Sequence, residues 1–108
     1  MQKLIEKALP EISKFSEKYH VERLYLFGSA TQPTFSETSD IDFLVSFQEI
    51  PLLDYADNFF DFKFELEDLF NRKIDLISEK SLTNPYLIKS INRTKILLYD
   101  RRNSKVFA

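Results

Sequence analysis

Apolar residues near the start of the chain recur every three or four positions, the period of an amphipathic helix. In residues 2–19 the apolar positions of this pattern are Ile5, Leu9, Ile12, Phe15 and Tyr19. Pro10 interrupts the pattern, because proline lacks a backbone N–H and its ring crowds the preceding turn. The sequence therefore predicts a helix that is either kinked at Pro10 or begins near it, with residues 3–9 as a separate turn.

The longest predicted helix covers residues 53–71, with Asp54 as its N-cap. Its apolar residues form two neighbouring stripes. The first stripe consists of Tyr55, Phe59, Phe62, Leu66 and Leu69, and the second of Phe60, Phe64 and Phe70. Two stripes exceed what one core-facing side needs. The second stripe has two interpretations, a surface for a partner protein or additional packing in a phenylalanine-rich core.

Four short runs rich in strand-forming residues predict strands at residues 23–27, 40–47, 73–78 and 95–99. A short helical turn from Ser29 and a polar loop separate the first two. A third helix is predicted to begin at Asn84-Pro85, a cap followed by proline at the first helical position. The resulting order is helix, strand, strand, helix, strand, helix, strand. It predicts an α+β (α/β) fold.

The composition narrows the class of protein. The 108 residues are 44% hydrophobic and 30% charged, as in folded proteins, and without repeats or linkers we expect one domain over residues 1–108, with a basic tail at about 100–108. The absence of cysteine excludes a thiol nucleophile and a thiolate metal site. A net charge of −2 argues against strong nucleic-acid binding. No apolar run approaches the roughly 20 residues that span a bilayer, and we expect a cytoplasmic location.

Three aspartates are the candidate catalytic and metal-binding residues. Asp40 and Asp42 are two positions apart on one predicted strand, so their side chains share a face. Two carboxylates held so close repel unless a cation lies between them, and Mg²⁺ prefers such hard oxygen ligands. If residues 73–78 pair beside residues 40–47, Asp75 adds a third carboxylate. Three acids could then hold two metal ions for an in-line displacement at phosphorus.

The chain's one glycine, Gly28, directly follows a predicted strand, and Ser29 follows it. A glycine at a strand end followed by the start of a helical turn lets backbone amides approach a phosphate with no side chain in the way. We therefore expect Gly28 and Ser29 to bind nucleotide. The alternatives are an ordinary turn for Gly28, a solvated strand edge for Asp40 and Asp42, and pairing of Asp75 with a lysine.

These residues carry a resemblance to a known family. LFGS at residues 26–29, ten intervening residues and DID at 40–42 resemble the Gly-Ser-x10-Asp-x-Asp signature of polymerase β-type nucleotidyltransferases. The flanking sequences are similar to the minimal nucleotidyltransferase (MNT) branch over residues 5 to 100, approximately. The resemblance implies a small mixed sheet with helices packed against it, two Mg²⁺ ions and ATP. It implies that Asp40 and Asp42 bind metal, that Asp75 helps to activate the attacking hydroxyl, and that Gly28 and Ser29 bind the triphosphate.

The resemblance also implies a function. Many members of the branch are antitoxins that transfer AMP from ATP to a tyrosine of a HEPN-type ribonuclease toxin. Where family members commonly have Arg-Gly after the Gly-Ser turn, this chain has Gln32 and Pro33. Because glutamine cannot neutralise phosphate charge, we expect weaker triphosphate binding or an altered substrate. The alternative is an antitoxin-like module that neutralises its partner by contact alone. The nucleotide base, the acceptor residue, the number of nucleotides transferred and the oligomeric state, homomeric or heteromeric, stay open.

Overall fold

The structure is a computed structural model that describes residues 2–103. It contains three α-helices, four strands and three short 3-10 helices in these residues. In chain order they are α1 (Lys3–Lys18), β1 (Val21–Phe27), η1 (Gly28–Thr31), β2 (Ile41–Phe47), α2 (Leu52–Phe70), β3 (Ile74–Ser78), η2 (Glu79–Ser81), α3 (Pro85–Thr94), β4 (Ile96–Asp100) and η3 (Arg101–Asn103). The predicted order of helices and strands is confirmed. No helix in this part of the chain is long and apolar enough to cross a membrane.

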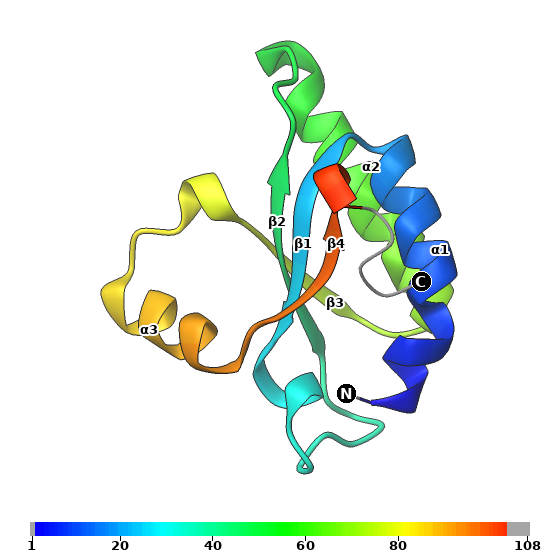
Figure 1. Cartoon of the computed structure of the whole chain (residues 1–108), viewed down its shortest axis with the longest axis vertical. Coiled ribbons are helices and arrows are strands. Elements are labelled where there is room, and N and C mark those ends of the chain that lie inside the picture. The colour runs from blue at the N-terminus through cyan, green and yellow to red at the C-terminus, as the bar shows by residue number, and fades with distance from the viewer. Residues whose placement is uncertain (1, 104–108) are drawn as a thin grey trace.

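The four strands form one mixed sheet in the order β3-β2-β1-β4. The central strand β1 is antiparallel to both β2 and β4. β2 and β3 are parallel, which requires a crossover, and α2 provides it. Figure 1 shows α1 and α2 on one side of the sheet and α3 on the other. The predicted α+β fold with a small mixed sheet is confirmed.

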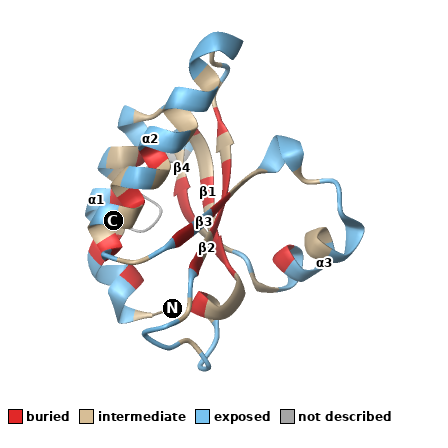
Figure 2. Ribbon diagram, turned by 180° about the vertical axis from the view of Figure 1, so that it is seen from behind, coloured by how far each residue is buried: buried red, intermediate tan, exposed pale blue. Residues whose placement is uncertain are grey.

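The main core lies between the sheet and the pair α1 and α2. Side chains of alternate strand residues face these helices, and Figure 2 shows the buried residues concentrated along the strands and the facing helix surfaces. The largest fully buried residues of this core are Phe43, Phe62, Ile5, Ile12, Leu24, Leu26, Ile41, Leu66, Ile74, Val21 and Val45. Because Ile41, Phe43 and Val45 are committed to this core, Asp42 and Leu44 face the opposite side of the sheet.

The opposite face is covered only in part, by a smaller apolar cluster under α3. Phe27, Leu44 and Ile91 are buried there, and partly buried neighbours surround them. Asn84 caps α3, since its side-chain oxygen accepts hydrogen bonds from the amides of Tyr86 and Leu87. The predicted start of this helix is confirmed. The cluster packs α3 against this face, and the last residue of α3, Thr94, contacts the Gly28 turn at the end of β1.

The structure excludes one of the two alternatives for the first helix and corrects the predicted cap of the second. α1 runs without interruption through Pro10, so residues 3–9 are not a separate turn. Proline inside a helix costs about 3 kcal/mol, and burial of Ile5, Ala8 and Ile12 on both sides of it offsets that cost. Asp54 is not the N-cap of α2, because that helix begins at Leu52, after Pro51. Asp54 lies in the first turn, where a carboxylate still interacts favourably with the helix dipole.

The second apolar stripe of α2 divides between core and surface. Phe70 is buried, whereas Phe60 and Phe64 are 48% and 54% exposed. The interpretation of these two rings as a partner surface stays a prediction. In the predicted basic tail, Arg101 pairs with Glu22 at 2.9 Å between Nε and Oε1, while residues 104–108 lie outside the described residues.

Candidate active site

The pairing of β2 with β3 brings the three aspartates to one end of the open face. Asp42 and Asp75 are direct neighbours in the parallel register, so their side chains project to the same side of the sheet. Asp40 precedes β2 by one residue and is exposed, as is Asp75, whereas Asp42 is half-buried. Among residues 2–103 no lysine or arginine forms an ion pair with any of the three. The alternative that a lysine pairs with Asp75 is thus not what the structure contains.

The carboxyl group of Asp42 lies in an unfavourable electrostatic environment. Burial, followed by the charges of Asp75 and Asp40, raises its pKa from 3.8 to about 6. Loss of hydration and nearby like charge both disfavour ionisation, and no basic group compensates for them. The site therefore has a surplus of negative charge, which favours the binding of a cation.

Gly28 is in direct contact with this carboxylate. Its φ of +73° is in the left-handed region, which other residues adopt at a cost. A Cβ atom built on Gly28 would overlap Oδ2 of Asp42. Glycine is thus required here both for the turn after β1 and for the close approach of the Asp42 side chain. The interpretation of Gly28 as an ordinary turn residue does not account for this contact.

The turn at Gly28 is also tied to α3. The Gly28 amide donates a hydrogen bond of 3.1 Å to Oγ1 of Thr94, the last residue of that helix. This amide is therefore not free to bind a phosphate. The sequence predicts the opposite, that the backbone amides of this turn approach a phosphate. The helical turn η1 begins at Gly28, one residue before the start predicted at Ser29. The amides of Ser29 and Ala30 have no partner inside η1, because a 3-10 helix bonds each amide to the carbonyl three residues earlier, but Ala30 is fully buried.

The loop that leads to Asp40 is held by Arg72, a residue whose role sequence reasoning did not find. Nη1 of Arg72 donates hydrogen bonds of 3.1 Å to the carbonyl oxygens of Ser36 and Ser39. The guanidinium also stacks at 4.7 Å from the ring of Phe35. Arg72 comes just before β3, so it fixes the approach to Asp40 relative to the strand that carries Asp75. Neither Thr94 nor Arg72 lies in a recognisable sequence pattern, since both act through contacts distant in sequence.

The donor set fits a hard divalent cation. All three side chains offer carboxylate oxygens, and Asp42 combines partial burial with uncompensated negative charge. In the described residues no three acidic or histidine side chains converge closely enough to form a ready-made metal shell. Mg²⁺ commonly takes one or two protein carboxylates and completes its shell with water and substrate phosphate oxygens. A site of this kind does not need three converged ligands.

A groove of about 570 Å³ lies on the same face of the sheet, away from the three aspartates. Tyr25 and Leu44 form part of its floor, and Ile88, Asn92 and Lys95 line it from α3 and its end. The packing of Ile91 on Leu44 and Phe27 stands between this groove and Asp42. The groove is thus separate from the carboxylate site.

Comparisons with known proteins agree with this arrangement. A family model described as "Polymerase beta, Nucleotidyltransferase" matches residues 10–104. A candidate protein adenylyltransferase of Methanocaldococcus jannaschii is 42% identical over 80 residues, 74% of this chain and 79% of that protein. A solved candidate minimal nucleotidyltransferase superposes with a TM-score of 0.67 at 30% identity, covering 85% of this chain and 90% of its own.

A third likeness concerns the fold alone. The solved complex of the tri-AMPylated HEPN toxin of Shewanella oneidensis with its MNT antitoxin contains a chain that superposes with a TM-score of 0.61. The identity is 20%, with coverage of 100% of this chain and 81% of that one. The family match extends over most of the sequence, and it includes both the glycine turn and the strands that carry the aspartates. The chain belongs to the polymerase β-type nucleotidyltransferases, as the resemblance implied.

Proposed function

We propose that this protein transfers AMP from ATP to a hydroxyl group of a partner protein in a Mg²⁺-dependent reaction. The observation that carries the proposal is the contact of Gly28 with Asp42, beside Asp75. It puts a turn suited to phosphate next to carboxylates suited to metal ions. The name of the Methanocaldococcus relative, protein adenylyltransferase, supports AMP as the group transferred.

Each residue of the site has a distinct role in this proposal. Asp40 and Asp42 hold the metal ions, with Asp75 completing the second site. Mg²⁺ held by these carboxylates would supply positive charge to offset the negative charge of the transferring phosphoryl group and of the leaving pyrophosphate. The Ser29 hydroxyl and the Ser29 amide bind the β- and γ-phosphates. This orientation leaves the α-phosphorus facing the carboxylates.

The reaction forms one bond to phosphorus and breaks another. The acceptor oxygen bonds to the α-phosphorus, the bond from that phosphorus to the bridging oxygen of the β-phosphate breaks, and pyrophosphate leaves. Asp75 orients the acceptor hydroxyl and takes its proton. Asp75 is exposed, so a hydroxyl arriving from outside the protein can reach it.

We propose a HEPN-type toxin as the partner that carries the acceptor, with a tyrosine as the acceptor residue. The solved complex of similar fold, between an MNT antitoxin and its AMPylated HEPN toxin, supports this choice. The protein would then act as an antitoxin in the cytoplasm, inactivating the toxin by modification. The competing function is neutralisation by contact alone, which Gln32 and Pro33 favour because they leave the turn without a basic residue.

The two functions are separated by one experiment. The purified protein is mixed with the proposed HEPN-type partner, Mg²⁺ and ATP labelled at the α-phosphate, and compared with the Asp40→Asn/Asp42→Asn variant. We expect label on the partner with the wild type and none with the variant or with EDTA. Absence of transfer by the wild type, with toxin neutralisation intact in the variant, would establish the contact mechanism instead.

A further inference from the structure

The candidate nucleotide site lacks positive charge of its own in the described part of the chain. None of residues 28–32 is basic, and no lysine or arginine pairs with Asp40, Asp42 or Asp75. The polar side chains of the turn form hydrogen bonds within it: the Thr31 hydroxyl donates to the Gly28 carbonyl at 2.7 Å, and the Gln32 side-chain amide donates to the Thr31 hydroxyl at 3.0 Å. A triphosphate adds several negative charges, so its binding requires cations from elsewhere in the fold.

The C-terminal half of α3 is a source of two such cations. The Thr94 hydroxyl accepts a hydrogen bond from the Gly28 amide, so the last turn of α3 lies directly against the turn proposed to bind phosphate, η1. Arg93 is adjacent to Thr94 in sequence, and Lys89 lies one helical turn before Arg93, on the same side of the helix. Both side chains are exposed, and neither forms an ion pair with another described residue.

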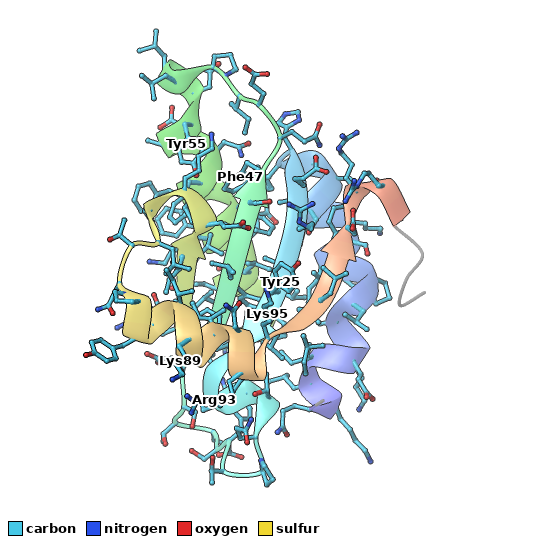
Figure 3. All side chains as sticks on the ribbon, turned by 60° about the vertical axis from the view of Figure 1, so that its left-hand side comes forward. Tyr25, Phe47, Tyr55, Lys89, Arg93 and Lys95 are labelled. Carbon is cyan, nitrogen blue, oxygen red and sulfur yellow. The ribbon has the colours of Figure 1, made fainter. Side chains whose placement is uncertain are left out.

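The two sides of α3 differ in what they face. In Figure 3, Lys89 and Arg93 lie on the side of α3 toward η1 and the start of β2, whereas Tyr25 and Lys95 lie on the other side. The ammonium group of Lys95 is 4.8 Å from the ring of Tyr25, in the separate groove. The Lys95 side chain therefore packs on an aromatic ring in the other groove. Lys89 and Arg93 lie on the side of α3 that faces η1 and the start of β2.

We propose that Lys89 and Arg93 form the cationic wall of the nucleotide site and bind the β- and γ-phosphates of the nucleoside triphosphate. This inference rests on the proposed function, because it assigns residues to the same substrate. The guanidinium of Arg93 suits bidentate contact with phosphate oxygens, while Lys89 adds a mobile point charge. The two side chains supply the positive charge that a basic residue within η1 would otherwise provide. The hydrogen bond from Gly28 to Thr94 fixes the end of α3 that carries them next to η1.

The test measures nucleotide binding by calorimetry, with Mg²⁺ present. The probe is an ATP analogue with a methylene bridge between the α- and β-phosphorus atoms, and AMP is the comparison ligand. Lys89→Gln/Arg93→Gln is compared with Lys95→Gln, which changes charge at the same end of α3 but faces the other side. We expect the double variant to lose about tenfold in triphosphate affinity for each charge-assisted contact removed, and to keep its affinity for AMP.

Lys95→Gln is expected to bind the analogue as the wild type does, and Arg93→Lys is expected to retain part of the affinity that the glutamine variant loses. Thermal denaturation establishes that each variant is folded, as expected for exposed positions. Wild-type affinity in the double variant would overturn the inference, as would an equal loss in Lys95→Gln. If the wild type itself does not bind the analogue, the proposed function fails rather than the assignment of these two residues.

Discussion

Replacement of Asp42 by asparagine should stabilise the metal-free protein near neutral pH. The carboxyl group has a raised pKa, about 6 against an ordinary 3.8, because of burial and of Asp75 and Asp40. When folding raises the pKa of a carboxyl group, ionisation of that group lowers the free energy of unfolding, whereas the protonated group has no such cost. The folded protein is therefore penalised progressively as the pH rises from about 4 through about 6, and the full penalty is present above that. Asparagine has nearly the same shape and no charge.

The size of the effect follows from the pKa difference. At about 1.4 kcal/mol per pH unit, the rise from 3.8 to about 6 corresponds to roughly 3 kcal/mol, before solvent screening is considered. Because Asp42 is only partly buried, screening by solvent reduces this to about 1–2 kcal/mol. For a domain of this size, that free energy corresponds to a rise in Tm of about 4–8 °C.

The assay is thermal unfolding followed by circular dichroism in EDTA, at about pH 7.5 and again below pH 4. We expect Asp42→Asn to have the higher Tm at about pH 7.5 and no advantage below pH 4. Asp61→Asn, an exposed carboxylate on α2, is the matched control and should leave Tm unchanged. Mg²⁺ should raise the Tm of the wild type more than that of Asp42→Asn. An equal or lower Tm of Asp42→Asn at about pH 7.5 in EDTA would refute the electrostatic argument.

Three further substitutions test other parts of the account. Gly28→Ala should lower stability by about 1–3 kcal/mol and displace Asp42, measurable as a lower Tm and weaker Mg²⁺ binding; unchanged Mg²⁺ binding would contradict the contact. Phe62→Ala should cost about 3–5 kcal/mol in chemical denaturation, whereas Phe64→Ala, at a half-exposed position two residues further along α2, should cost well under half as much. Arg72→Ala should cost about 1 kcal/mol and accelerate amide exchange in residues 36–40, with Arg72→Lys restoring only part of the protection because lysine lacks the planar guanidinium that stacks on Phe35; unaltered exchange in Arg72→Ala would remove Arg72 from the site's support.

The arrangement of the carboxylates was largely predictable from the sequence. The alternation of apolar and acidic residues in 40–47 determines which face of the strand is buried, so Asp42 had to face away from Ile41 and Phe43. The position of Asp75 needed one further assumption, that β3 pairs beside β2. The structure contains this pairing, and local pattern alone could not establish it.

Other features depend on contacts between distant residues and leave no local signal. Thr94 reads as an ordinary helix-terminal residue until α3 docks on the turn at Gly28, 66 positions earlier. The sequence left open whether one helix runs through Pro10, for a related reason. A local rule places a break there, and tertiary burial on both sides of Pro10 overrides it.

The central claim, that the protein is an active adenylyltransferase toward a partner protein, is tested most directly by intact-mass spectrometry of the HEPN partner. The partner is incubated with ATP, Mg²⁺ and either the wild type or Asp42→Asn. We predict that the partner gains the mass of one or more AMP groups with the wild type and none with Asp42→Asn. An unmodified partner after incubation with the folded, Mg²⁺-bound wild type would contradict the claim.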